Sequence, residues 1–374
     1  MSNAAKIQYL ALDVDESRFH GCLVPAAGPE VVEFYTLADT GELVKKVEKI
    51  RDPASELRIC YEATYLGFSL QRQLSQRGYC CEVIAPSLIP KKPGECVKTD
   101  RRDCRKLAEY YRKGLLTVVH IPDEGDEKVR GLIRSRGFLS GQLKALKGHL
   151  IACGRRMCLD YKRQTGGVYW TQVHRDWLWK QIKALAEDAL KVNLERLMLQ
   201  VEHLETELRV YEDEIERLSR GEKYRDAVQA LCCYRGIDTL SALTLVSELG
   251  DIRRFDHPRR LTSYAGFGIV EQSSGGRQRR YHTSGAGNRF IRTTLVEACQ
   301  SVFYPPRISR ALTRRREGAD LRWIETADRG MVRLHRKAQR LWHAHKSKNK
   351  IKVACARELL GFVWESLRNV SCKN

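Results

Sequence analysis

Four acidic residues in the first third of the sequence have the types and spacing needed to hold divalent metal ions. Asp13 ends the apolar segment YLAL, Glu62 ends RICY, and Asp100 and Asp103 open a predicted helix in KTDRRDC. Residues three apart on a helix share a face, so Asp100 and Asp103 can point into one site. Gathered carboxylates repel one another unless cations lie among them, and oxygen ligands suit Mg²⁺ or Mn²⁺. Two such ions stabilise the attacking and leaving oxygens of a phosphoryl transfer, and the four acids predict that chemistry.

The segments around these acids alternate between strand and helix patterns. Strands are predicted over IQYLALDV, FHGCLVPA, VVEFYTL, LRICYEA and CEVIAP, and helices over GELVKKVEKI, LGFSLQRQLSQRG and DRRDCRKLAEYYRKG. We therefore expect an α/β domain over residues 1–125, with an opening antiparallel hairpin and a mixed sheet. Acids at strand ends would gather at one edge of that sheet, where clefts form.

Beyond residue 125 the strand pattern stops and helical patterns follow. Apolar residues recur at steps of four and three from Leu190 to Leu218, which is typical of a coiled-coil seam. The seam would pair either with another helix of the same chain or with a second copy. Residues 126–222 are therefore predicted to be a helical, coiled-coil region for dimerisation and nucleic-acid binding.

Residues 223–374 are predicted to form a mostly α-helical third domain. Two of its helices, joined through Gly236, look like a helix-hairpin-helix element, whose turn could offer backbone N–H groups to a phosphate. An ordinary helical turn is the alternative for this segment.

The positive charge of the chain is concentrated in two blocks. The 374 residues carry 66 Lys and Arg against 46 Asp and Glu, a net charge of +20. Residues 251–374 hold 27 basic and 10 acidic residues, and 128–163 hold 10 basic residues with one acid. Between them, 176–220 hold 7 basic and 11 acidic residues. Solvated helix faces are one explanation, but long blocks nearly free of acids favour a nucleic-acid partner.

The composition also excludes other classes of protein. Hydrophobic residues make up 43% and charged residues 30%, values of a folded chain. No run of about 18 apolar residues is present, so no membrane span is expected. The first residues reach an acid at Asp13 without a small-residue cleavage site, so we expect no signal peptide and a cytoplasmic protein.

The motifs together resemble a known family. The order LALDVDES, ICYEAT and KTDRRDCRKLAEYYRKGLL is similar to the RuvC-like, DEDD-type transposases of bacterial insertion sequences. GIDTLSALTLVSELGDIRRFDHPRRLTSYAGF and EQSSGGRQRRYHTSGAGNRFIRTTLVEA resemble the second domain of that family. The resemblance implies an RNase H-like first domain, in which Asp13, Glu62, Asp100 and Asp103 are the catalytic metal ligands.

The resemblance also implies a nucleophilic serine. The family has it in a Ser-Gly dipeptide eight residues after the glycine of a YAG-like motif, so Gly266 leads to Ser274, with Ser273 as a second candidate. A serine hydroxyl must be deprotonated or held in line with a phosphodiester whose charge is neutralised.

Basic and polar residues near Ser274 could supply that neutralisation. Arg277, Arg279 and Arg280 follow within one predicted loop, and their planar guanidinium groups fit phosphate oxygens. Asn288 and Arg292 lie where a helix is expected to begin, a position that suits a phosphate contact.

The family resemblance implies a recombinase that cuts and rejoins DNA. A structured RNA encoded by the mobile element would pair with donor and target DNA, and a dimer or dimer of dimers would carry out the reaction. The acids and Ser274 would then meet within one subunit or between subunits. Two alternatives stay open: a metal nuclease of the junction-resolvase type that uses only the four acids, and a non-catalytic protein that binds RNA or DNA.

Overall fold

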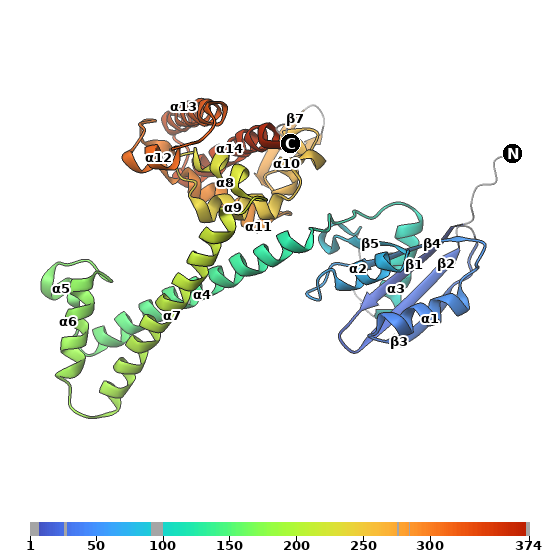
Figure 1. Cartoon of the computed structure of the whole chain (residues 1–374), viewed down its shortest axis with the longest axis horizontal. Coiled ribbons are helices and arrows are strands. Elements are labelled where there is room, and N and C mark those ends of the chain that lie inside the picture. The colour runs from blue at the N-terminus through green and yellow to red at the C-terminus, as the bar shows by residue number, and fades with distance from the viewer. Residues whose placement is uncertain (1–6, 26–27, 91–99, 275–276, 284, 372–374) are drawn as a thin grey trace. The chain divides into compact units, whose positions relative to one another are not determined.

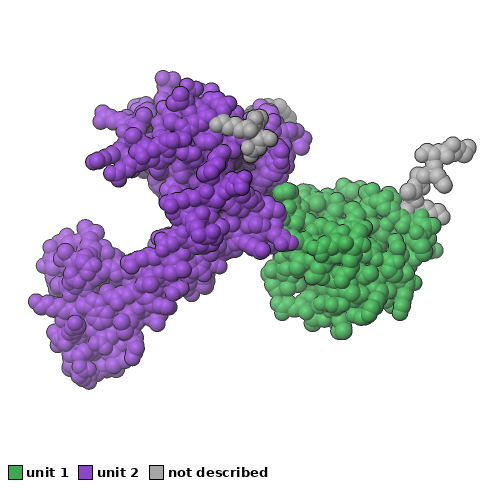
Figure 2. All heavy atoms as spheres, in the orientation of Figure 1, with its two compact units in different colours: residues 1–122 green, residues 123–374 purple. Residues whose placement is uncertain are grey.

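The chain forms two compact units, Met1–Pro122 and Asp123–Asn374, each with its own core (Figure 2). The computed structural model describes residues 7–25, 28–90, 100–274, 277–283 and 285–371. Side chains of residues 100, 101, 270–282 and 371 lie outside that description.

The first unit contains a mixed five-stranded sheet with the order β3-β2-β1-β4-β5. The strands are β1 (Ile7–Val14), β2 (Arg18–Pro25), β3 (Val32–Leu37), β4 (Glu56–Glu62) and β5 (Cys80–Ile84). β1 pairs antiparallel with β2 and parallel with β4. The predicted opening hairpin and mixed sheet are therefore confirmed, and the sheet is consistent with an RNase H-like domain.

Helices cover both faces of this sheet (Figure 1). On one face, α1 (Thr40–Ile50) and α2 (Ser69–Gln76) pack their leucines against alternate residues of β1, such as Leu10 and Leu12. On the other face, α3 (Asp100–Arg112) packs against Ala11 and Cys60. Successive strand residues point to opposite faces, so these contacts fix which face each later residue of β1 and β4 lies on.

The second unit begins with a long helical arm (Figure 1). Its helices are α4 (Glu124–Arg156), α5 (Tyr161–Thr165), α6 (Gln172–Lys183) and α7 (Ala189–Ser219). α4 and α7 pack together, and ion pairs join Arg136 to Glu212 and Lys147 to Glu205. The pairs run in opposite order along the two helices, so the helices are antiparallel.

The apolar stripe of α7 packs within its own chain. The residues at one set of seven-residue intervals are buried, namely Leu194, Val201, Leu208 and Ile215. The stripe residues between them are half-buried, namely Leu190, Leu197, Leu204, Tyr211 and Leu218. This arrangement fits the same-chain alternative, and a seam with a second copy stays a prediction.

The rest of the second unit is a helical body around one large core. Its helices are α8 (Arg225–Cys232), α9 (Thr239–Leu249), α10 (Pro258–Tyr264), α11 (Arg289–Ala298), α12 (Arg310–Arg315), α13 (Leu321–His343) and α14 (Lys348–Ser371). α14 packs against α8, α10, α11 and α13. Among the described helices, none is long and apolar enough to cross a membrane.

The second unit also contains a two-stranded hairpin, β6 (Ile269–Ser274) and β7 (Arg277–Thr283), between α10 and α11 in the sequence. The loop predicted for this segment is wrong, because its two halves pair as antiparallel strands. Two glycines separate the strands, and a two-residue turn between short extended segments is a recognised hairpin signal.

Candidate functional site

Asp13 and Glu62 occupy matching positions on neighbouring parallel strands. The β1–β4 register pairs Leu12 with Tyr61, so each acid is one step beyond a paired residue. Asp13 is two residues after Ala11, and Glu62 is two residues after Cys60, so both acids lie on the face that α3 covers. Asp13 is exposed and Glu62 is half-buried. The fold thus brings two of the four predicted acids to one face and one end of the sheet.

The first turns of α3 bring the other two acids towards the same end. The thiol of Cys104 lies 3.3 Å from the carbonyl oxygen of Ala11 and 3.4 Å from that of His20. His20 is the β2 residue paired with Asp13, so the contact fixes α3 beside the end of β1. Burial raises the pKa of Cys104 well above its usual range, so its thiol stays uncharged.

The acids on α3 lie on its sheet-facing side. Asp100 is four residues before Cys104, and Asp103 is four before Leu107, and both later residues are buried against the sheet. Asp103 is half-buried, whereas the side chain of Asp100 lies outside the described residues.

The four predicted ligands have the chemistry that a hard divalent cation requires. All the donors would be carboxylate oxygens, the ligands that Mg²⁺ prefers. Among the described side chains, no three His, Cys, Asp or Glu residues form a group that could hold a metal ion. Three of the four predicted ligands belong to the described side chains, so a complete site is not described.

Ser274 is the last residue of β6, at the tip of the hairpin. The register pairs Ser274 with Arg277, Gln272 with Arg279, and Glu271 with Arg280. Directly opposed residues lie on the same face of an antiparallel pair, and the faces alternate along it. Arg277 and Arg279 therefore share the face of Ser274, whereas Arg280 is on the other. The side chains of Ser274 and these arginines lie outside the described part.

Close backbone packing joins the two ends of the hairpin segment. A Cβ on Gly287 would lie 2.5 Å from the carbonyl oxygen of Tyr264 and from the nitrogen of Gly266. Asn288 N–H donates to the same Tyr264 oxygen at 2.9 Å. Arg292 Nη1 donates to Ala265 O at 3.0 Å. The described contacts of Arg292 thus hold the base of the hairpin, and its phosphate contact stays a prediction.

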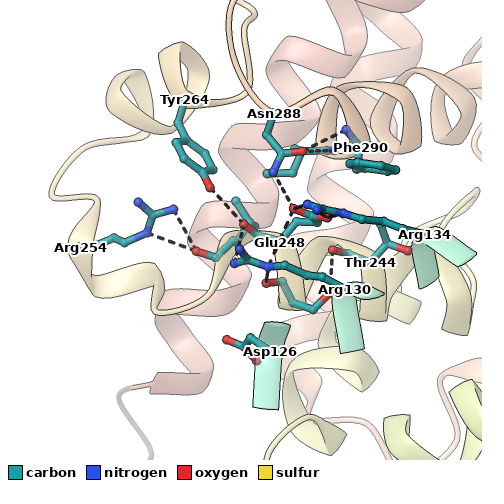
Figure 3. Close-up of polar contacts among 12 residues, drawn as sticks. Asp126, Arg130, Arg134, Thr244, Glu248, Arg254, Tyr264, Asn288 and Phe290 are labelled. Carbon is teal, nitrogen blue, oxygen red and sulfur yellow. Dashed lines mark hydrogen bonds and ion pairs between the residues drawn. The ribbon is translucent and has the colours of Figure 1, made fainter. Parts of the chain in front are cut away.

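A buried carboxylate lies beneath this base, as Figure 3 shows. Glu248 on α9 is 2% exposed and accepts from Arg134 of α4 through both carboxylate oxygens, at 2.8 and 3.1 Å. Asn288 Nδ2 donates to Glu248 Oε2 at 2.7 Å. Asn288 Oδ1 in turn accepts from the N–H groups of Phe290 and Ile291 and so caps α11. A single acid therefore ties α4, α9 and the end of the hairpin segment together.

Glu248 is not among the residues predicted from the sequence. A signal was available, because Glu248 is the only charged residue in the otherwise apolar or neutral helix TLSALTLVSEL. A lone charge in such a helix needs a buried partner.

Gly236 lies in a tight contact inside the body. Its φ is +92°, and a Cβ there would lie 2.2 Å from the carbonyl oxygen of Ala298. The turn between α8 and α9 has a glycine at this position for packing against the end of α11. Its predicted phosphate contact and the helix-hairpin-helix role remain predictions.

Two family models match the chain. One, described as the transposase IS116/IS110/IS902 family, matches residues 228–312 and so covers α9, the hairpin and α11. The other, a DEDD transposase model of IS110, matches residues 10–157 and so covers the sheet, α3 and α4. The two matches include all the predicted site residues.

Whole-chain relatives agree with these models. A Sinorhizobium fredii protein that carries the name transposase y4qE is 34% identical over 87% of this chain and 78% of its own length. The transposase for insertion sequence element IS1533 of Leptospira borgpetersenii is 27% identical over 89% of this chain and 96% of its own. The transposase for insertion sequence element IS1111A of Coxiella burnetii is 21% identical over 79% of this chain and 78% of its own length. The chain is a DNA transposase, and it belongs to the IS110 family of insertion-sequence transposases.

Proposed function

We propose that this transposase cuts and rejoins DNA with two sets of groups, a divalent-metal site on the first unit and Ser274 on the second. The observation that carries the proposal is the β1–β4 register, which ends at the Leu12–Tyr61 pair and so leaves Asp13 and Glu62 each one residue beyond it, on the face that α3 covers. Asp100 and Asp103 complete the acid set. Membership of a DEDD transposase family supports dependence on a divalent metal, and Mg²⁺ or Mn²⁺ fits four carboxylates.

In the proposed mechanism, a bound divalent cation would neutralise charge on the phosphodiester undergoing attack. The carboxylates of Asp13, Glu62, Asp100 and Asp103 would hold the cations. The hydroxyl of Ser274 attacks phosphorus, its proton leaves to a base or to water, and the phosphodiester bond breaks with departure of one DNA oxygen. Arg277 and Arg279 bind the phosphate oxygens, since they share the hairpin face of Ser274.

Attack by the DNA hydroxyl on the phosphoserine bond would reverse the first step and rejoin the strand. A covalent intermediate keeps the bond energy, so joining needs no other source of free energy. The acids and Ser274 belong to different compact units. They meet within one chain or between subunits, and a homo-oligomer, a dimer or dimer of dimers, would allow the second arrangement.

The proposal includes a structured guide RNA encoded by the element, which would pair with donor and target DNA in the bacterial cytoplasm. Family membership and the net charge of +20 support it. That charge suits a protein that holds more than one polyanion.

Substitutions at the two sets separate this proposal from its rivals. Purified protein would be given supercoiled donor and target DNA, guide RNA and Mg²⁺, and cleavage and strand exchange would be measured separately. Ser274→Ala should abolish both, and Ser273→Ala should leave both largely intact. Asp103→Asn and Asp13→Asn should each lower both by at least about 100-fold.

Each rival predicts a different result. If Ser274→Ala kept cutting DNA at the normal rate, the protein would be a metal nuclease of the junction-resolvase type. If the Asp100→Asn and Asp103→Asn double variant kept full function, the acid site would be degenerate and the protein a binding protein.

A further inference from the structure

A long stretch near the C-terminus carries positive charge without any acid. Residues 329–357 include ten Lys and Arg and no Asp or Glu. They span most of α13, the turn after it and the start of α14. The acids that pair with this stretch must therefore come from elsewhere, and their positions decide where its charge is neutralised.

Part of this charge is neutralised by two acids of α14. Glu365 pairs with Arg329, and Glu358 pairs with Arg333 and also with Lys337, the last at 2.6 Å. These ion pairs lie along the middle of the α13–α14 helix pair.

The other end of the helix pair has no such partners. Within the part of the chain that the structure describes, none of its lysines and arginines forms an ion pair with a carboxylate, namely Arg336, Arg340, Lys346, Lys348 and Lys350. Every residue from 342 to 350 is exposed. Positive charge left without counter-ions attracts a polyanion and releases its condensed cations on binding.

An exposed aromatic ring lies beside one of these lysines, at the turn after α13. Trp342 is 49% exposed, although it belongs to the last turn of α13. Phe303 packs against it edge-on with ring centroids 6.1 Å apart, and the Lys348 ammonium lies 5.7 Å from the ring centroid. The indole is therefore supported by neighbours while much of its surface remains open to a ligand.

The turn that displays these residues is well defined. His345 N–H donates to Trp342 O at 2.9 Å, and Lys346 N–H donates to Leu341 O at 3.1 Å, the pair of bonds of a Schellman motif. His345 has a φ of +54°, in the left-handed region that usually takes glycine. The backbone bonds hold a non-glycine residue there, so Trp342 and the lysines are presented in a fixed arrangement.

We propose that this surface binds an unpaired segment of RNA. The turn surface is defined as Trp342, Lys346, Lys348 and Lys350. An open indole stacks on the face of a base, and base faces are available in single strands but hidden within a duplex. The loops of a structured RNA expose base faces before any DNA is bound, whereas DNA exposes them only where the guide RNA has opened the duplex, so we assign RNA as the occupant. This inference rests on the guide RNA of the proposed function.

Binding measurements can test the surface without any DNA cleavage. Ser274→Ala protein would be titrated into fluorescent 12-nucleotide single-stranded RNA, DNA of the same sequence and duplex DNA, at several salt concentrations. The triple variant Lys346→Glu, Lys348→Glu, Lys350→Glu should bind single-stranded RNA at least about tenfold more weakly. Its slope of log affinity against log salt should fall by about 2, because single strands give about 0.7 per phosphate contact.

Two further variants separate stacking from charge. Trp342→Ala should weaken RNA binding about tenfold with an unchanged salt slope, and Trp342→Phe should keep most of the affinity because it retains a ring face. A control with three exposed lysines reversed elsewhere, Lys46→Glu, Lys49→Glu and Lys183→Glu, should stay within about twofold of the parent. Circular dichroism should show the same helix content in every variant.

Several results would overturn the assignment. These are equal losses in the control, unchanged RNA binding in Trp342→Ala, stronger binding of the DNA oligonucleotide than of RNA, or a loss confined to duplex DNA. The guide-RNA proposal is tested separately, by binding of the element's own RNA to protein with an intact turn surface. If that RNA fails to bind while the short RNA still depends on Trp342, the surface stands and the guide role fails.

Discussion

The side-chain amide of Asn288 donates to the buried carboxylate of Glu248, while its carbonyl oxygen caps α11. One side chain thus satisfies a buried acid and the start of a helix at the point where the Ser274 hairpin segment ends. The cap explains why α11 begins at Arg289, and the bond to Glu248 fixes that start against α9. We infer that this contact holds the base of the hairpin in place and takes no direct part in the reaction.

Asn288→Ala should lower the free energy of unfolding by about 3 kcal/mol. It removes a helix cap, worth about 1 kcal/mol, and a hydrogen bond to a buried charged group, worth about 2 kcal/mol. Urea denaturation followed by circular dichroism would measure it, with the exposed Asn193→Ala on α7 as the matched control. Unchanged stability together with weaker DNA binding would instead support the predicted phosphate contact.

Gly236→Ala should be far more costly than an ordinary glycine replacement. The new Cβ would lie 2.2 Å from a backbone oxygen, and φ is positive, so a loss of about 3 kcal/mol or more is expected. Gly318→Ala is a matched control, because φ is +73° but the nearest atom is a side-chain nitrogen at 3.8 Å. It should cost only about 1 kcal/mol. Equal losses in denaturant midpoint for the two variants would contradict a packing role for Gly236.

His174 should make the tip of the helical arm sensitive to pH. It is buried, and its Nδ1 accepts from the backbone N–H of Trp170 at 3.0 Å. Burial, followed by the charge of Arg175, lowers the pKa of His174 below its usual 6.5. Its other ring neighbours are Tyr161, Tyr169 and Trp177.

The sign follows from the direction of that shift. In the unfolded chain His174 takes up a proton near pH 6.5, whereas in the folded arm it does so only at lower pH. The free energy of unfolding is therefore highest above pH 6.5 and falls as the pH drops below it. The protection of backbone amides across residues 160–183, expressed as exchange relative to the intrinsic rate at each pH, should therefore fall between pH 7 and 5. His174→Gln should remove most of this dependence, and the exposed His203→Gln should not. An identical pH profile in His174→Gln would refute the assignment.

The sheet domain could be predicted well because its patterns are local. The segment IQYLALDV is β1 residue for residue, and the buried Leu10 and Leu12 alternate as a half-covered strand requires. Strand ends could therefore be located, and with them Asp13 and Glu62. The pairing that brings the two acids side by side depends on parallel register, which no local pattern encodes.

The second unit was harder to predict because its contacts join distant segments. Arg134 and Glu248 are 114 residues apart in sequence, and Gly236 packs on Ala298 across 62 residues. The hairpin was missed because Arg277, Arg279 and Arg280 give its second strand no apolar alternation. The Gly275-Gly276 pair was the local signal that favoured a hairpin.

The most direct test of the central claim is the chemical identity of the DNA–protein link. Protein would be incubated with guide RNA, Mg²⁺ and a DNA substrate that traps the cleaved strand. Denaturation, nuclease and protease digestion and mass spectrometry would then locate any nucleotide-modified residue. We expect a nucleotide joined to the Ser274 hydroxyl, absent in Ser274→Ala and strongly reduced in Asp103→Asn. Efficient cleavage with no covalent link, or a link on another residue, would contradict it.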